Sequence, residues 1–358
     1  EPTSLGYDVL IQSWLAKLPE SLVSLVPKLQ TLFDIFLPSL FPFLRRSLVE
    51  PLPTATNSLV AAVLNLMDTF VTPYHPNDDA SLDKTPEEVA AFLNQIEPVW
   101  IFCIIWGLCA TVSADSRILF EAFVRNDMCA RGMSAHMPPT SGSMYDFKFD
   151  VESSSWIHWT KSTSPYAYDP KASFAELIIP TKDSICYTYL LDILVRNKKH
   201  VLMTGPTGTG KTVNILGHLG GGLPDKYIPL SMGFSAQTSA NQTQDLIDSK
   251  CEKRRKGIYG PPVGKEFVIF VDDVNMPAKE VYGAQPPVEI LRQWFDSSSW
   301  YDRKALESRK IVDVIFVCAC GPPGGGRNHV TARFYRHFNT ITYVDIADES
   351  LQLIFGTI

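Results

Sequence analysis

Residues 205–212 have the types and the spacing of a loop that binds phosphate. They fit the pattern G-x-x-x-x-G-K-[ST] and lie between an apolar run, 201–203, and a helical pattern that begins near Val213. Glycines let successive backbone N–H groups turn toward a phosphate, and the following helix adds the positive end of its dipole. The alternative is an empty glycine-rich turn. The loop consists of Gly205, Pro206, Thr207, Gly208, Thr209, Gly210, Lys211 and Thr212.

Two side chains of this loop predict a nucleotide that carries a metal ion. Lys211 supplies a full positive charge for the β- and γ-phosphate oxygens, and Thr212 supplies a hydroxyl for Mg²⁺. Some sixty residues later the apolar run 267–271 ends in Asp272 and Asp273. Asp272 is the second candidate Mg²⁺ ligand, directly or through water. The alternative is that the two carboxylates cap the next turn. The sequence therefore predicts ATP or ADP with Mg²⁺ as cofactors.

Short apolar runs after residue 136 supply the strands that position this loop. Strands that alternate with helical patterns predict a parallel, doubly wound sheet of the α/β class. The Val201 run precedes the phosphate loop, and the Phe267 run precedes Asp272. The expected strands are 200–204, 227–232, 267–272, 311–320 and 339–344.

The first third of the chain has a helical period instead. Apolar residues recur every three or four positions from about residue 8 to 130, and Pro or Asn/Asp clusters interrupt them. Helices are expected over 54–70, 86–95 and 98–123. The Pro-, Gly- and Ser-rich segment near 137–142 marks the domain boundary. The prediction is an all-α helical subdomain over 1–135, an α/β nucleotide-binding subdomain over 136–345, and the start of a helical lid over 346–358.

Composition excludes several classes of protein. The 358 residues carry a formal charge of -6, and the run Lys253-Arg254-Arg255-Lys256 is interpreted as a solvated helix end, so no nucleic acid is expected. The longest apolar run, 99–112, is too short to cross a bilayer, so no membrane partner is expected. Seven scattered cysteines indicate a reducing compartment, and Cys318 and Cys320 are interpreted as buried small hydrophobes. The start at Glu1-Pro2 suggests a piece of a longer protein.

Several segments together resemble the third AAA+ module of dynein heavy chains. The strings 272–277, Asp-Asp-Val-Asn-Met-Pro, and 321–328, Gly-Pro-Pro-Gly-Gly-Gly-Arg-Asn, are similar to the axonemal branch. Before residue 130 a pattern of Trp, Pro and helices is similar to the small helical subdomain that ends the second module. The other segments that carry the resemblance are 178–181, 205–212, 234–240 and 282–287.

The resemblance implies roles for further residues. Ile179 and Pro180 would pack near the adenine, and Asp273 would take the place of the catalytic glutamate. Arg333 would reach the nucleotide of the preceding module as an arginine finger, with Arg336 as the second candidate. The alternative is that both arginines hold carbonyl groups or acids near their own helix end.

Two departures from the AAA+ pattern favour slow hydrolysis. Asp273 is one methylene shorter than the usual glutamate, and Gly321 stands where a polar sensor, commonly Asn, usually ends the strand. A glycine there can also signal a positive φ angle. A displacement of about 1 Å at the reacting centre can cost on the order of a hundredfold in rate. The phosphate clamp uses other residues, so binding is expected to survive.

The predicted function is a regulatory nucleotide site within a microtubule motor of a cilium or flagellum. The resemblance implies neighbouring AAA+ modules of the same heavy chain, other dynein subunits, and microtubules bound by parts of the full chain outside this sequence, where a coiled coil also lies. It implies the cytoplasm, the cytoskeleton and the axoneme as location. The alternatives are an active ATPase site, a structural spacer whose loop holds no nucleotide, and an unrelated P-loop kinase or translocase.

Overall fold

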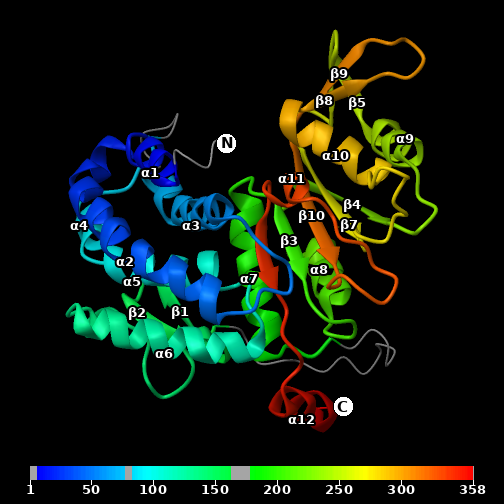
Figure 1. Ribbon diagram of the computed structural model, residues 1–358. Helices are drawn as coiled ribbons and strands as arrows, with labels where there is room; N and C mark the ends of the chain where they lie inside the picture. Colours follow the sequence, from blue (N-terminus) through cyan, green and yellow to red (C-terminus); the bar gives the residue numbers. More distant parts are fainter. Residues whose placement is uncertain (1–5, 77–82, 163–177, 358) are drawn as a thin grey trace. The chain divides into compact units, whose positions relative to one another are not determined.

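The computed structural model describes residues 6–76, 83–162 and 178–357, and the chain divides into two compact units (Figure 1). The first unit comprises Glu1–Glu50, Leu59–Leu190 and Val344–Ile358. The second unit comprises Pro51–Ser58 and Leu191–Tyr343. The phosphate loop and both candidate acids therefore belong to the second unit. The predicted boundary between residues 135 and 136 stays a prediction.

The first unit is mainly helical. Its longest helix buries an apolar stripe that includes Leu29, Phe33 and Phe36, and Pro27 lies in its first turn, where a missing N–H costs no hydrogen bond. Its most apolar helix, α5, is buried on all sides, as an interior helix must be. The helices are α1 (Asp8–Leu15), α2 (Val26–Ser47), α4 (Pro86–Leu93), α5 (Ile96–Leu108), α6 (Ala114–Ala130), α12 (Asp348–Thr357) and most of α3 (Thr56–Val71) and α7 (Lys182–Arg196).

One predicted helix of this unit is wrong. The apolar pattern over 98–123 predicted a continuous helix, whereas α5 ends at Leu108 and α6 begins at Ala114. Ser113 adopts the extended conformation of an N-cap, with φ -65° and ψ 165°, and Asp115 lies in the first turn of α6. A Ser followed by an early acid is a helix start signal that the apolar period concealed.

A short antiparallel hairpin follows these helices within the first unit. Strand β1 (Phe147–Asp150) pairs with β2 (Ser155–His158), with Phe147 opposite His158. Trp159 follows β2 and is fully buried, and its indole N–H donates to the carbonyl oxygen of Tyr145 at 2.9 Å. Alternation over four residues is too short for the sequence to have indicated this hairpin.

The described helices include none that is by itself long and apolar enough to span a membrane. Helices α4 and α5, which are bent by 60° at the break between them, pass that test of length and composition only when taken as a pair.

The second unit contains the predicted parallel sheet. Its five strands lie in the order β11-β3-β10-β7-β4, and every neighbouring pair is parallel. Each expected strand is present with small shifts of its ends. The strands are β3 (Val201–Thr204), β4 (Tyr227–Gly233), β7 (Glu266–Asp272), β10 (Val314–Cys320) and β11 (Asn339–Thr342).

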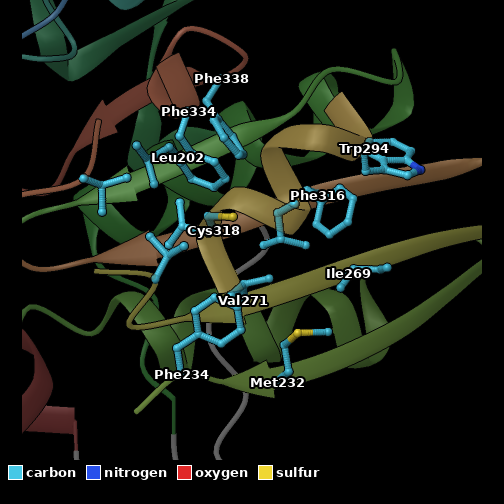
Figure 2. Packing of buried hydrophobic residues seen from close by; sticks show 14 of the residues in the cluster. Leu202, Met232, Phe234, Ile269, Val271, Trp294, Phe316, Cys318, Phe334 and Phe338 are labelled. Atoms are coloured by element: carbon cyan, nitrogen blue, oxygen red, sulfur yellow. The ribbon is translucent and has the colours of Figure 1, made fainter. Parts of the chain in front are cut away.

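Both faces of the central strands are buried, which explains why their sequences are apolar throughout instead of alternating. One face packs against α9 (Ala240–Lys250), α10 (Pro286–Ser297) and α11 (Ala332–Tyr335). On that face Ile269 and Val271 of β7 lie beside Phe316 and Cys318 of β10, and Trp294 of α10 packs against Phe316 with ring centroids 4.9 Å apart (Figure 2). This packed layer fixes the strands whose carboxyl ends carry the candidate site.

A second, four-stranded sheet in the order β5-β6-β9-β8 corrects the interpretation of the basic run. Lys253, Arg254 and Arg255 form most of strand β5 (Glu252–Arg255), not a helix end. Gly257 has a φ of 74° and allows the turn into β6 (Ile258–Gly260). Arg254 donates to the carbonyl oxygen of Pro261 and pairs with the Asp313 carboxylate, so this charge is neutralised within the fold. The other strands are β8 (Ser299–Tyr301) and β9 (Ser308–Ile311).

Candidate functional site

The carboxyl ends of three adjacent strands bring the candidate residues together. Strand β10 lies between β3 and β7, with Cys320 opposite Thr204 and Cys318 opposite Val271. The phosphate loop leaves β3, and Asp272 ends β7. In an open α/β sheet, ligands bind outside the carboxyl ends of the strands. The sheet thus places the loop and the acid on either side of the segment that follows β10.

Glycines are required in the loop for two different reasons. Gly208 and Gly210 have φ angles of 87° and 78°, and a Cβ atom built on either would have no neighbour within 4 Å. Their backbone conformation therefore demands glycine while the space beside them stays open. Gly205 is also packed closely, because a Cβ there would lie 2.5 Å from the carbonyl oxygen of Tyr343. Open space lined by backbone is what a phosphate cradle needs.

Lys211 begins helix α8 (Lys211–Gly221), and its side chain folds back over the loop. Its ammonium group donates to the carbonyl oxygens of Gly205 and Pro206 at 2.9 and 2.6 Å, and to the Thr209 hydroxyl at 3.2 Å. Burial lowers the pKa of Lys211, and the nearby positive charge of Arg327 lowers it further, although Cys320 and the two acids oppose this. A bound anion would stabilise the charged form of Lys211, which burial and Arg327 disfavour. The position of this lysine over the loop is therefore suited to binding phosphate.

The two predicted magnesium ligands contact each other. The Thr212 hydroxyl donates to Oδ2 of Asp272 at 2.8 Å, across 60 residues of sequence. Neighbouring ligands of an octahedral Mg²⁺, with bonds of 2.0–2.1 Å, lie about 2.9 Å apart. The distance between these two oxygens fits neighbouring ligands of one magnesium ion, and their role as its ligands stays a prediction.

Asp273 has a positive φ angle, which is uncommon outside glycine but is better tolerated by aspartate than by most other residue types. Its φ angle is 50°, in the left-handed region that few residues other than glycine adopt. Its N–H donates to Oδ1 of Asp272 at 2.9 Å, and its own Oδ1 lies 3.2 Å from Nη2 of Arg327. The side chain is 42% exposed. The carboxylate therefore lies at the site, but one of its oxygens already has a cationic partner.

Gly321 does not have the positive φ that a glycine here could signal. The reason for glycine is space: a Cβ atom would lie 2.6 Å from Nε and 2.7 Å from Cδ of Arg327. The sequence suggested that a polar group was simply missing at the end of β10. The structure places a guanidinium there instead.

Arg327 and two asparagines are the site residues that the sequence reasoning missed. Arg327 follows three glycines in the loop after β10. The Asn275 amide donates to the carbonyl oxygen of Gly321 at 2.8 Å, and the Asn328 amide donates to that of Pro277 at 2.9 Å. Their signal was present in the two strings similar to axonemal dyneins, 272–277 and 321–328, although no role was assigned to them.

The two candidate finger arginines differ. Arg336 forms an ion pair with Asp296 at 2.6 Å, which matches the alternative of a local structural role. Arg333 is exposed on α11, and among residues 6–76, 83–162 and 178–357 no hydrogen-bond or ion-pair partner is found for it. Arg333 is thus the one of the two that is available to a partner.

Other predicted residues lie apart from this geometry. Ile179 is buried and Pro180 half-buried in the first unit, just before α7, so their predicted role beside adenine stays a prediction. Cys318 and Cys320 are free, buried thiols on one face of β10, as interpreted. Burial raises the pKa of Cys320 to about 11, which leaves it protonated and unreactive.

Comparison with known proteins assigns a family to both parts of the chain. Residues 166–346 match the family model described as P-loop containing dynein motor region, and residues 29–161 match the Dynein heavy chain AAA lid domain. Mouse Dynein axonemal heavy chain 1 is 40% identical over 376 residues, covering 100% of this chain and 9% of the relative. Mouse Dynein axonemal heavy chain 12 is 39% identical over 378 residues, covering 100% and 12%. Human Dynein axonemal heavy chain 3 is 38% identical over 382 residues, covering 100% and 9%.

Proposed function

Because the chain belongs to the dynein heavy chain family, we propose that it binds MgATP or MgADP as a regulatory nucleotide site of a motor. The chain spans 9–12% of the length of the relatives compared above, so motor activity belongs to a longer protein. The observation that carries the proposal is the 2.8 Å hydrogen bond between Thr212 and Asp272, beside a phosphate loop whose lysine is already folded over it.

The phosphate clamp has a separate task for each side chain. Lys211 binds the β- and γ-phosphate oxygens, and the N–H groups of the loop surround the β-phosphate. Thr212 and Asp272 hold magnesium, which neutralises phosphate charge when it is bound. Ile179 and Pro180 pack near the adenine. These residues make the main contacts to the nucleotide and its metal ion.

Slow or absent hydrolysis is expected because the residues that would position the attacking water molecule are incomplete. Asp273 is one methylene shorter than the glutamate that usually polarises the attacking water molecule, so its carboxylate is poorly placed for that task. Gly321 contributes no side chain. A nucleotide that is bound but hydrolysed slowly is suited to regulate the other AAA+ modules of the motor through its long occupancy of the site. The complete magnesium clamp favours one rival, a hydrolytically active site that contributes directly to the motor cycle.

The module assignment extends this proposal to the whole chain. Residues 1–135 form the small helical subdomain of a second AAA+ module, residues 136–345 the large subdomain of the third, and 346–358 the start of its lid. Arg333, exposed on α11, serves the nucleotide of the preceding module. The partners are neighbouring modules, other dynein subunits and, through other parts of the heavy chain, microtubules. The location is the axoneme of a cilium or flagellum.

Calorimetric titration with MgADP and MgATP tests the nucleotide site. Lys211→Ala is expected to weaken both nucleotides at least about tenfold, because it removes a charge-assisted contact worth roughly 1.5–3 kcal/mol, while the fold persists. Lys310→Ala, at an exposed position on β9, is the matched control and is expected to bind as the unaltered chain does. Equal affinities for the Lys211→Ala and Lys310→Ala chains would refute the assignment.

A further inference from the structure

The Arg327 side chain occupies the space beside Gly321. Any other residue at position 321 would place its own side chain in that space. A Cβ atom on Gly321 would lie 2.6, 2.7 and 2.8 Å from Nε, Cδ and Cζ of Arg327. Gly321 directly follows β10, the strand between the one that leads to the phosphate loop and the one that ends in Asp272. A guanidinium therefore stands between the two halves of the candidate site.

The contacts of Arg327 join those two halves. Its Nη1 donates to the Thr207 hydroxyl of the phosphate loop at 3.1 Å, and its Nη2 donates to Oδ1 of Asp273 at 3.2 Å. Its Nε is buried and has no hydrogen-bond partner among the described residues. Buried donors are normally satisfied, so an unused one at a candidate ligand site indicates an acceptor still to come.

The backbone that presents Arg327 is held on the Asp273 side. Gly324, Gly325 and Gly326 have φ angles of 118°, 57° and 89°, and the turn closes with hydrogen bonds of 3.1 and 3.0 Å between Gly324 and Arg327. The next residue, Asn328, is held by two hydrogen bonds. Its backbone N–H donates to the carbonyl oxygen of Asn275 at 2.9 Å, and its side-chain amide donates to that of Pro277 at 2.9 Å. The guanidinium can thus change partners while its backbone stays in place.

We propose that Arg327 binds the γ-phosphate of ATP within its own module. When it does so, it exchanges its ion pair with Asp273 for an ion pair with that phosphate. This rests on the proposed nucleotide site. With ADP the Arg327–Asp273 pair persists, whereas the terminal phosphate of ATP takes the guanidinium and releases the Asp273 carboxylate.

Charge and geometry support this exchange. The carboxylate of Asp273 is 42% exposed, and ion pairs at this exposure are weak. A terminal phosphate offers more negative charge and more acceptor oxygens, and a guanidinium binds phosphate with two parallel hydrogen bonds. Arg327 already lies close enough to Lys211 to lower its pKa, although burial is the larger cause. Two cations that face one loop are stabilised together by a polyphosphate.

The test compares two ligands, MgADP and the Mg²⁺ complex of a non-hydrolysable ATP analogue, by calorimetry on the 358-residue chain. Arg327→Gln keeps amide donors and removes the charge. It is expected to weaken the ATP analogue by about tenfold and MgADP by less than about twofold, because one charge-assisted contact is lost for one ligand alone. Arg292→Gln, which breaks ion pairs with Glu289 and Asp296 on α10, is the control and should change neither affinity.

A second variant tests the exchange itself. Asp273→Asn removes the competitor for the guanidinium, so it should tighten the ATP analogue relative to MgADP by a few-fold. In an Arg327→Gln background the same change should have no such effect, because the two side chains act through one ion pair.

The outcomes separate this inference from the nucleotide site on which it rests. If Lys211→Ala weakens both ligands while Arg327→Gln leaves their ratio unchanged, the site stands and the role of Arg327 is refuted. Equal weakening of both ligands by Arg327→Gln refutes it as well. If thermal unfolding reveals that Arg327→Gln does not fold, Asp273→Asn decides alone: no gain for the ATP analogue over MgADP overturns the exchange.

Discussion

The two ends of strand β3 are built in opposite ways. At its amino end the His200 ring lies among aromatic rings, with centroid distances of 4.8 Å to Phe295 and 5.7 Å to Trp294. At its carboxyl end Gly205 leads into a loop with glycines at positive φ and open space beside them. The packed end contributes stability, and the open end gives up side-chain packing so that backbone donors can face a ligand. Changes at the two ends should therefore separate stability from affinity.

The largest effect is expected at the packed end and depends on pH. Burial lowers the pKa of His200 from 6.5 to about 3, and its Nδ1 accepts a hydrogen bond from the N–H of Phe316, which only the neutral ring can do. Between these pH values the unfolded chain binds a proton that the folded chain does not. Stability from this group is thus complete above pH 6.5 and falls with decreasing pH by about 1.4 kcal/mol per unit.

Urea unfolding from pH 7 to pH 5 measures this dependence. His200→Asn keeps an acceptor near the position of Nδ1 and does not titrate, so the slope of unfolding free energy against pH should flatten. His329→Asn, at an exposed position, should keep the slope of the unaltered chain. A slope unaffected by His200→Asn would show that the packed end does not control acid stability.

At the open end, magnesium dependence should be lost without loss of stability. Asp272→Asn removes the carboxylate that meets the Thr212 hydroxyl at 2.8 Å, so Mg²⁺ should no longer strengthen nucleotide binding. We expect the ratio of affinities with Mg²⁺ and with chelator to fall about tenfold, as for loss of one charged contact. Asp225→Asn, at an exposed position, is the control. An unchanged ratio for Asp272→Asn would remove this residue from the metal site.

A smaller, rate-specific effect is expected from restoring the hydrolytic residues. Asp273→Glu with Gly321→Asn should raise single-turnover hydrolysis roughly tenfold, which is less than the roughly 10²–10⁴-fold that a fully positioned base contributes. Either change alone should do less, because both act on one water. The structure adds that the new asparagine side chain must displace Arg327, since even a Cβ on Gly321 would lie 2.6 Å from Nε. Thermal unfolding controls for lost stability, and a double variant that folds but hydrolyses no faster would contradict the prediction.

The smallest effect is expected from Arg333. If it serves the preceding module, Arg333→Ala should leave the nucleotide affinity of this chain unchanged, because its exposed side chain has no hydrogen-bond or ion-pair partner among the described residues. Calorimetry checks this expectation. A clear loss of affinity would show instead that Arg333 acts on the nucleotide of its own module.

How much the sequence could predict depended on whether backbone or side chains determine a feature. The phosphate loop, Asp272 and the five strands were predictable, because glycine positions and apolar runs encode backbone requirements directly. The location of Arg327 was not, because three glycines at positive φ precede it and its contacts with Thr207 and Asp273 span 120 and 54 residues. Contacts over such separations leave no local pattern.

The helical part illustrates the same limit. The apolar period correctly indicated helices, but it ran through the break between Leu108 and Ala114, since Cys109, Ala110 and Val112 within the break are apolar and buried too. Lys253 to Lys256 looked like a solvated helix end because charge alone was considered. Arg254 instead pairs with Asp313, which lies 59 residues away in the sequence. The local sequence therefore gave no sign that this run forms a strand.

The central claim is that this chain binds nucleotide well and hydrolyses it slowly, and single-turnover hydrolysis with bound MgATP tests it most directly. Chain in excess over radiolabelled MgATP would be followed for release of phosphate, with Lys211→Ala as the control whose nucleotide binding is weakened. The account predicts Lys211-dependent binding and a hydrolysis rate far below about 1 per second, the lower end of the usual enzyme range. A Lys211-dependent rate of about 1 per second or faster would contradict the account and establish an active ATPase site.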